Sequence, residues 1–374
     1  MNIAYIAYAS IIEQTGVFEK ILCQVEALQS LNHKVHLIII DSLSTSDISY
    51  NVDMNIICNK FAKLGVLSRY VFQFFVPNKL NRTLNLIKPD IIYFRYPLYL
   101  PFIGKVLYET KVPIVMEING NPLDELQAKG EKLIYFIEKN KGGSLLNVAN
   151  GFVGVSEESV RYGLQCINKN IPHIVIGNGI DCNKIQFLNY YPEYTYYNIV
   201  YIGNRTVWAG IDRLINPLTK DKTIKLHLFG KGWSDDTEIK PLIKSGQVIN
   251  HGYIPSNEVD SFLSVIDVGF GPLGLHRMNF REASPMKVRR YLAHGIPVVI
   301  GYDDADNLDE NEFVLKVPAN DDPLDLDRIK RFVIEARNNK AIRFQARSFA
   351  QKNMDYKVKM ERLATFLKQI VNKR

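Results

Sequence analysis

Short apolar segments rich in Ile, Val and Tyr alternate with longer amphipathic segments along the chain. Segments that are short, continuous and β-branched are typical of strands buried on both faces of a parallel sheet. The pattern predicts strands at 3–8, 35–40, 91–94, 114–117, 152–155, 173–176, 199–202, 225–229, 248–250, 268–270 and 297–300. Between the first two strands, apolar residues recur at i, i+3 and i+4 from Val17 to Leu28, which predicts a helix with one apolar face.

The alternation of strands and helices favours an α/β fold with right-handed crossovers, and it occurs twice along the chain. The periodicity is lost between residues 186 and 198, where we place the hinge between two Rossmann-like domains. The predicted domains are 1–188 and 198–352, followed by a helix at 353–374 that can pack back on the first domain. Ligands of doubly wound sheets bind at the carboxyl ends of the strands, so we expect a site in the cleft between the domains.

The composition is that of a soluble globular protein, since 47% of the 374 residues are hydrophobic and 23% are charged. A net charge of +7 suits anionic ligands, a lipid surface or nucleic acid, and does not select among them. The four cysteines lack zinc or C-x-x-C spacing, so we expect reduced packing residues of a cytosolic protein. We expect no signal peptide. Charges and prolines interrupt the longest apolar region, 93–108, so we do not expect it to span a membrane as one helix.

The segment 279–299 carries the clearest signals for chemistry. Ser284 is a good N-cap, Pro285 suits the first helical position, and Gly295 is placed to end the helix in the left-handed conformation. These signals predict a helix of about ten residues. Its first turn combines the positive end of the helix dipole with Lys287, which is a site for an anion such as phosphate. The alternative is an ordinary surface helix with a solvated lysine.

This segment resembles the donor-binding signature of retaining glycosyltransferases of the GT-B fold, family 4. Their pattern is S-P-x-K-x-x-E-Y-x-A-x-G-x-P-V-V, preceded by an acidic residue. The chain matches the Ser, Pro, Lys, Tyr, Ala, Gly, Pro and both Val positions, and Glu282 occupies the acidic position. Arg290 stands where the family has its second Glu, which is a clear departure.

Further matches follow in the family's order along nearly the whole chain. Gly203, Asn204 and Arg205 follow a predicted strand, like the first loop of the family's nucleotide-binding domain, although Ala209 stands where Lys is often found. Gly230 resembles the end of the next strand. The loop 251–255, with Tyr253 and Ile254, resembles the one whose backbone meets the nucleotide base. Residues 177–181 and 155–157 resemble the family's N-G-V-D turn and V-S-E strand end.

The resemblance implies roles for these residues in donor binding. Lys287, the backbone of Ser284–Met286 and then Arg205 would hold the donor diphosphate and stabilise the charge that develops on the leaving group. Glu282 would contact the hydroxyls of the donor sugar, or is only an acid favoured at a helix start. Arg290 has five donors and no acceptor, so it would contact ribose, a phosphate or an acidic sugar, or form an ion pair with Glu282 or another nearby acid.

The first half would hold the acceptor, as the resemblance implies. Gly16 precedes the first helix, where backbone N–H groups would approach the donor phosphates or the bound sugar. Glu117 and Asn119 lie at the carboxyl end of a predicted strand, where many relatives place a His. Asn119 is nearest that position, which suits front-face attack without an imidazole base. The alternative for 117–120 is a plain turn.

The segment 54–89 contains six basic residues and no acidic residue, with aromatic residues among them. The basic residues are Lys60, Lys63, Arg69, Lys79, Arg82 and Lys88, and Tyr70, Phe72, Phe74 and Phe75 lie among them. Cations beside aromatics suit docking on an anionic membrane surface. The alternative is a partly buried helix pair with solvated lysines.

Together these patterns predict a cytoplasmic retaining glycosyltransferase that is able to attach to the inner face of a membrane. It would move a sugar from a nucleotide-diphosphate donor to a saccharide acceptor. The donor would be a UDP-sugar rather than a GDP-sugar, and the acceptor would be linked to a lipid in surface polysaccharide assembly. We expect no metal and no cofactor, because protein cations and a helix end would replace a metal ion at the diphosphate, and we expect no nucleic-acid partner. The rival functions are a nucleotide-sugar epimerase of the same architecture and a non-catalytic sugar- or partner-binding subunit.

Overall fold

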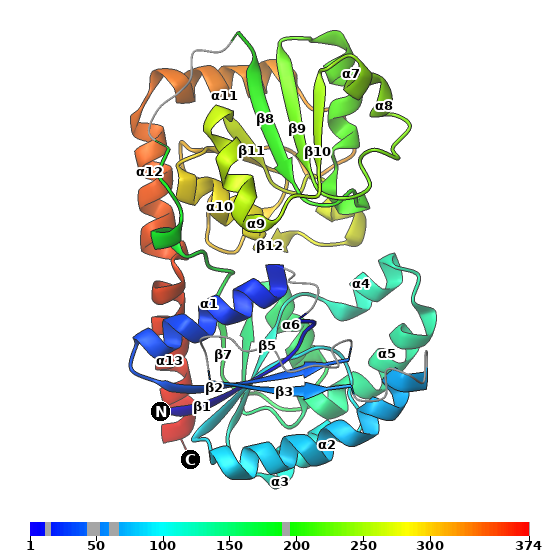
Figure 1. Cartoon of the computed structure of the whole chain (residues 1–374), viewed down its shortest axis with the longest axis vertical. Coiled ribbons are helices and arrows are strands. Elements are labelled where there is room, and N and C mark those ends of the chain that lie inside the picture. The colour runs from blue at the N-terminus through cyan, green and yellow to red at the C-terminus, as the bar shows by residue number, and fades with distance from the viewer. Residues whose placement is uncertain (12–15, 43–52, 60–66, 189–194, 374) are drawn as a thin grey trace. The chain divides into compact units, whose positions relative to one another are not determined.

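The computed structural model describes residues 1–11, 16–42, 53–59, 67–188 and 195–373. The chain forms two compact units, each built around its own parallel sheet (Figure 1). The first unit contains Met1–Gly177 together with Tyr356–Arg374, and the second contains Asn178–Asp355.

The first unit is built on a seven-stranded sheet in the order β3-β2-β1-β4-β5-β6-β7. All neighbouring strands in this sheet are parallel. Its strands are β1 (Asn2–Tyr8), β2 (Lys34–Asp41), β3 (Met54–Cys58), β4 (Ile91–Arg95), β5 (Ile114–Ile118), β6 (Gly151–Gly154) and β7 (His173–Val175). The strands are apolar on both faces because helices cover both faces.

Helices on the two faces of this sheet bury different residues of the same strands. The helices are α1 (Gly16–Ser30), α2 (Leu67–Ile87), α3 (Ile103–Glu109), α4 (Pro122–Ala128), α5 (Lys132–Leu146), α6 (Glu157–Gln165) and α13 (Tyr356–Asn372). On one face, α2, α3 and α5 contribute Leu80, Ile103 and Leu145 to a core that includes Ile6 of β1. The helices α1 and α13 lie side by side and cover the other face (Figure 1).

The second unit is built on a six-stranded parallel sheet in the order β10-β9-β8-β11-β13-β15. Its strands are β8 (Tyr197–Ile202), β9 (Ile224–Phe229), β10 (Val248–Gly252), β11 (Val268–Phe270), β13 (Val298–Ile300) and β15 (Val314–Lys316), and a separate pair is β12 (Glu282–Ala283) with β14 (Asp303–Asp304). Its α-helices are α7 (Asp212–Lys220), α8 (Lys240–Lys244), α9 (Ser256–Val259), α10 (Met286–His294), α11 (Leu326–Asn338) and α12 (Ala341–Phe349).

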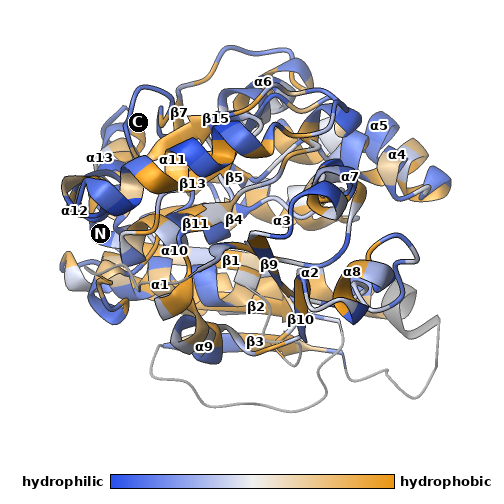
Figure 2. Ribbon diagram, turned by 90° about the horizontal axis from the view of Figure 1, so that it is seen from above, coloured by the Kyte–Doolittle hydropathy of each residue, from blue (hydrophilic) through white to orange (hydrophobic). Residues whose placement is uncertain are grey.

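The helices of the second unit also cover both faces of its sheet. On one face, α10 and α12 bury Tyr291, Leu292 and Ile342 in one core cluster. On the other face, α7 and α11 bury Leu214 and Phe332 in a second cluster. Both hydrophobic and hydrophilic residues occur along α11, as expected for a helix with one buried side (Figure 2).

All eleven strands expected from the apolar pattern are present, with ends shifted by at most a few residues. Four further strands, β3, β12, β14 and β15, lie outside the expected set. β12 and β14 have two residues each, and β15 has three half-buried residues, so none forms the continuous apolar run that identifies a buried strand.

The chain passes between the units at Gly177–Asn178 and again at Asp355–Tyr356. The first passage lies before the expected boundary at residue 188, because Ile180 and Leu188 are buried in the core of the second unit. The expected hinge segment includes residues 189–194, which lie outside the described residues. The final helix, α13, belongs to the first unit, where it packs against α1.

The four cysteines are free thiols, and Cys58 and Cys182 are buried. No helix within the described residues combines the length and apolar character needed to cross a bilayer.

Candidate functional site

Glycine turns end the first two strands of the second unit and pack directly against one another. Gly203 follows β8 with a φ of 151°, and Gly230 follows β9 with a φ of 129°. A Cβ on Gly230 would lie 2.3 Å from the carbonyl oxygen of Gly203, which no larger side chain tolerates. Gly203 N–H donates to Phe229 O at 2.7 Å, and Trp233 Nε1–H donates to Gly203 O at 2.9 Å. The carboxyl ends of these strands therefore form a tight surface with little side-chain bulk.

Lys287 lies over this surface, as the second residue of α10. Its Nζ is 3.8 Å from the centroid of the Tyr201 ring and would lie 2.8 Å from a Cβ on Gly203. Within the described part of the chain, no carboxylate pairs with Lys287. Burial lowers the pKa of Lys287 to about 7. The structure thus holds an uncompensated ammonium group at the helix start, where an anion would replace the missing counter-charge.

The start of α10 differs from the expected capping pattern. The N-cap is Pro285, without a side-chain cap hydrogen bond, and the helix begins at Met286. The Ser284 hydroxyl instead accepts a hydrogen bond of 2.6 Å from the backbone N–H of Asn178, whose Nδ2 donates to Ser284 O at 2.5 Å. The expectation of Ser284 as N-cap was wrong because this longer-range contact uses its hydroxyl. Gly295 ends the helix with a φ of 81°, as predicted.

Arg205 and Asn204 lie in the loop after β8. Arg205 forms an ion pair with Asp236, and its side chain remains 53% exposed. Asn204 Oδ1 accepts from the backbone N–H of Lys231 at 2.9 Å, which joins the loops after β8 and β9. Lys231 Nζ lies 5.1 Å from the ring centroid of Tyr253, which is 60% exposed.

Ile254 is half-buried and packs against the core of the second unit. Lys231 was not expected from the sequence. The sequence signal that could have identified Lys231 is a basic residue directly after Gly230, the glycine that follows β9.

Glu282 lies in the strand pair β12–β14 rather than in a helix start. It pairs in register with Asp303 and is half-buried. The pair is fixed to α10 by Arg289, which is fully buried and donates to both carboxylate oxygens of Asp304 at 2.6 Å. Arg289 also donates to Asp306 at 2.7 Å. Buried bidentate contacts of this kind hold the acidic segment and the helix in one arrangement.

Arg290 forms an ion pair with Asp260, at 3.1 Å between Nη1 and Oδ1. His294 Nε2 is 3.0 Å from the same oxygen. Within this unit Arg290 therefore forms an ion pair with an acid, as the alternative interpretation expected. The acid is Asp260 rather than Glu282.

The first unit contains a buried polar cluster around Glu117, at the end of β5. Glu117 is 1% exposed and accepts hydrogen bonds from Lys20 at 2.8 Å, Tyr93 at 2.5 Å and Gln24 at 3.2 Å. Burial alone would raise the pKa of Glu117, but the charges of Lys20 and Arg95 and these hydrogen bonds outweigh it and lower the pKa to about 2. Glu117 is an ionised internal group, which disagrees with a direct contact between Glu117 and an acceptor.

Unpartnered N–H donors lie beside this cluster. Asn119 Oδ1 accepts from Lys20 Nζ at 2.7 Å, whereas Asn119 Nδ2 and Arg95 Nη1 are buried without a hydrogen-bond partner. Buried donors without partners are rare because each costs about 1–3 kcal/mol. Two buried N–H groups at the carboxyl ends of β4 and β5 therefore lack a hydrogen-bond acceptor. Gly16, the first residue of α1, is exposed, with open space around its Cα.

Lys20 and Arg95 were not expected as site residues. Lys20 lies on the predicted amphipathic helix, where a basic residue is normally solvated, and only the pairing of β4 with β5 brings Arg95 opposite Glu117. No group of His, Cys, Asp or Glu within the described residues could hold a metal ion.

Solved structures similar to this chain include glycosyltransferases. The sucrose-phosphate synthase of Thermosynechococcus elongatus has 14% sequence identity and a TM-score of 0.69, over 99% of this chain and 100% of that one. HepE of Anabaena, in complex with UDP-glucose, has 15% identity and a TM-score of 0.66, over 98% and 99%. The lipopolysaccharide outer core galactosyltransferase WaaB has 14% identity and a TM-score of 0.65, over 98% and 100%.

The chain has the GT-B fold. The expected fold class, α/β with Rossmann-like domains, is confirmed by the two parallel sheets and by these neighbours. No protein-family profile matches the sequence, and no curated protein sequence matches it. Identities this low establish the GT-B fold and leave the chemistry to be argued from the site.

Proposed function

We propose that this GT-B chain is a glycosyltransferase that uses a UDP-sugar donor. The observation that carries the proposal is the unpaired Lys287 ammonium at the start of α10, over the glycine turns that end β8 and β9. A diphosphate matches this combination of charge, helix dipole and backbone space. The complex of HepE with UDP-glucose supports UDP as the nucleotide.

In the proposed reaction, Lys287 stabilises the diphosphate as it leaves. The bond between the anomeric carbon and the phosphate oxygen breaks, so negative charge grows on the β-phosphate. A fixed cation that meets this charge stabilises the transition state more than the bound substrate. Arg205 is the second cation, and rotation away from Asp236 would bring its exposed guanidinium to a phosphate.

We assign a retaining mechanism of the family 4 type to the site. The acceptor hydroxyl forms its bond to the anomeric carbon on the face that the phosphate leaves, and its proton passes to the departing phosphate oxygen. This scheme needs no side-chain base. Glu282 contacts the sugar hydroxyls and stabilises positive charge on the ring. The reaction uses no metal ion, so addition of a chelator should leave the rate unchanged.

The acceptor is assigned to the first unit, at the carboxyl ends of β4 and β5. The buried donors Asn119 Nδ2 and Arg95 Nη1 support this, because sugar oxygens would give them partners. A saccharide linked to lipid, in surface polysaccharide assembly, is the proposed acceptor, and the similarity to WaaB is in keeping with it.

A membrane surface is the proposed location of the acceptor, contacted through 54–89. Within this segment α2 exposes Phe74 by 61% and Phe75 by 47%, whereas Phe72 is buried. Arg82 and Lys88 are exposed, as needed for anionic lipid. Lys60 and Lys63 lie outside the described residues, as do the side chains of Arg69 and Tyr70.

The test is a transfer assay with UDP-glucose, UDP-galactose and GDP-mannose, with and without a membrane extract as acceptor. We expect UDP release that depends on the extract, and a labelled product with the anomeric configuration of the donor. Conversion of the donor sugar without extract would identify an epimerase instead. Binding of UDP without turnover under any condition would identify a non-catalytic subunit.

A further inference from the structure

One layer of helices carries nearly all of the large apolar side chains that the described part of the first unit exposes. The helices α2, α3 and α5 form this layer, whereas α1 and α13 cover the other face of the sheet (Figure 1). The exposed apolar side chains on or beside α2, α3 and α5 include Phe74, Phe75, Phe102, Tyr108, Leu133 and Phe136. Among the described residues of α1 and α13, only Val17 belongs to this class. Exposed apolar side chains that gather on one layer are typical of an interaction surface.

The clearest apolar stripe of this layer lies in the amino-terminal half of α5. Leu133, Phe136 and Ile137 recur at i, i+3 and i+4, so they lie on one side of the helix. Leu133 is 68% exposed and Phe136 is 65% exposed. The residues that α5 buries are Glu138, Gly142, Leu145 and Leu146. With 3.6 residues per turn, the exposed stripe and the buried residues lie on opposite sides of α5, so the stripe is not part of the core.

The exposed charged residues of α5 are all lysines. Lys132 and Lys139 lie along one edge of the stripe and Lys141 lies along the other. Within the described residues, none of these three lysines pairs with a carboxylate. The acid of this helix, Glu138, is buried and accepts hydrogen bonds from tyrosine hydroxyls. The outer surface of α5 therefore combines an apolar stripe with cations along both of its edges.

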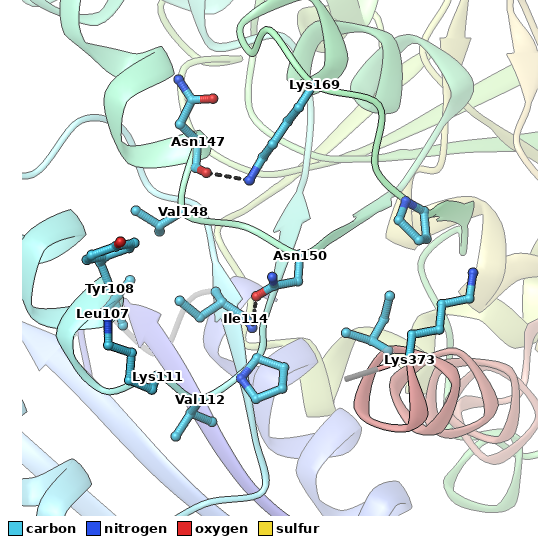
Figure 3. A pocket seen from close by; sticks show the side chains of 13 residues that line it. Leu107, Tyr108, Lys111, Val112, Ile114, Asn147, Val148, Asn150, Lys169 and Lys373 are labelled. Carbon is cyan, nitrogen blue, oxygen red and sulfur yellow. Dashed lines mark hydrogen bonds between the residues drawn. The ribbon is translucent and has the colours of Figure 1, made fainter.

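The helix that carries this stripe is fixed to the rest of the unit. Glu138 Oε2 accepts from the backbone N–H of Tyr99 at 2.7 Å, which joins the middle of α5 to the loop after β4. At the carboxyl end of α5, Lys169 Nζ donates to Asn147 O at 2.5 Å and to Ala149 O at 2.7 Å (Figure 3). A stripe on a helix that is already ordered binds a partner without the cost of ordering the helix.

The charges of α5 decide between the possible partners of this surface. In a symmetric dimer the same surface occurs on both sides of the interface, which would gather the lysines of two copies in one place. An anionic bilayer attracts these lysines to its head groups and accepts apolar side chains between its lipids. The combination of stripe and lysines therefore fits an anionic membrane better than a second copy of the chain.

We propose that α5 lies on the surface of an anionic membrane, with Leu133, Phe136 and Ile137 inserted between the lipids. The helix axis is parallel to the membrane, and Lys132, Lys139 and Lys141 lie at the head groups. This inference rests on the proposed function, which places the acceptor at a membrane, and it adds α5 to the contact through 54–89. The two contacts lie on one layer of the unit, because α3 packs against both α2 and α5.

The test is flotation of the full chain with two kinds of vesicle, phosphatidylcholine alone and phosphatidylcholine mixed with phosphatidylglycerol. We expect binding to the anionic vesicles, and binding at least about tenfold weaker to the neutral ones. Leu133→Ser/Phe136→Ser should weaken binding to the anionic vesicles by about tenfold or more, and so should Lys132→Gln/Lys139→Gln/Lys141→Gln. The matched control is Ile334→Ser/Phe344→Ser, which removes two exposed apolar side chains from the second unit and should bind like the natural protein.

The temperature of unfolding should be similar in all of these variants, because the changed side chains are exposed. Absence of binding to the anionic vesicles, or equal binding by the α5 variants and the natural protein, would overturn the proposal. Loss of binding only in Phe74→Ser/Phe75→Ser would also overturn it, while supporting the contact through 54–89. A dimer in the absence of lipid that Leu133→Ser/Phe136→Ser dissociates would show by analytical ultracentrifugation that a second copy covers α5 instead. Flotation measures no sugar transfer, so failure of this inference is distinguishable from failure of the proposed reaction.

Discussion

Lys287 is the residue on which the proposed chemistry depends most. It lies between the ring of Tyr201 and the glycine turn at Gly203, where it is half-buried and no acid within the described residues compensates its charge. Such a position is costly for an ammonium group alone and favourable once a phosphate is bound. We therefore expect both the affinity for the donor and its pH dependence to be set by the charge of Lys287.

Replacement of Lys287 by Ala should lower kcat/KM for the UDP-sugar by about 100- to 1,000-fold, because one preorganised cation at the leaving group is lost. The matched control is Lys225→Ala. Lys225 also lies over a tyrosine, 4.6 Å from the ring centroid of Tyr196, but at the amino end of β9. Steady-state kinetics of both variants checks the prediction, and equal activity of Lys287→Ala and the natural protein would contradict it.

The affinity for UDP should fall as the pH rises above 7. Burial lowers the pKa of Lys287 to about 7, so the fraction of the free protein with a charged Lys287 decreases above that pH. A bound diphosphate requires the charged form, which means that Kd rises by up to about tenfold per pH unit. Calorimetric titration with UDP from pH 6 to pH 9 measures this slope. The slope should disappear in Lys287→Ala, and a flat profile in the natural protein would refute the assignment.

At the scale of the element, the sequence predicted the presence and the end of α10 correctly, but not the residue that caps its start. Gly295 and Pro297 define the end of the helix through local conformation, which a sequence encodes directly. The role of Ser284 depends on Asn178, which is distant in the chain, and no local rule predicts that contact. The same limit applies to Glu117 at the end of β5. The sequence of a strand end is the same whether the last side chain contacts a ligand or, as here, the buried Lys20.

Replacement of Ser284 by Ala should destabilise the second unit by about 1–3 kcal/mol, because the half-buried Asn178 N–H loses its acceptor. Ser261→Ala is the control, since the exposed Ser261 hydroxyl only donates to Glu258 O within its own turn. Chemical denaturation of both variants gives the two free energies of unfolding. Equal values would show that the contact between Ser284 and Asn178 adds no stability.

At the scale of the whole molecule, two doubly wound units use the carboxyl ends of their strands differently. The second unit leaves a lysine uncompensated above glycine turns, and the first unit surrounds an ionised carboxylate with donors. The repeated strand and helix pattern predicted both sheets apart from their edge strands β3 and β15. The passage at Gly177 was not predictable, because the apolar residues that follow it at intervals, such as Ile180 and Leu188, suit either core.

The cluster around Glu117 should make the protein sensitive to acid. The pKa of Glu117 is lowered to about 2, so its contribution to stability is complete above its ordinary value of 4.5 and is lost as the pH falls towards 2. Glu117→Gln should cost about 3–5 kcal/mol at pH 7, because Lys20 is left buried and unpaired. Denaturation at several pH values should show this difference shrinking below pH 4.5. Glu109→Gln, at an exposed pair with Lys105, should show no such change, and a constant difference for Glu117→Gln would contradict the account.

The most direct test of the central claim is a crystal structure of the protein with UDP. We expect the β-phosphate within hydrogen-bond distance of Lys287 Nζ, about 3 Å, and next to the backbone N–H groups that begin α10. The turns at Gly203 and Gly230 should then lie against the nucleotide. A diphosphate bound elsewhere, with Lys287 still over Tyr201 and in contact with no phosphate oxygen, would contradict it.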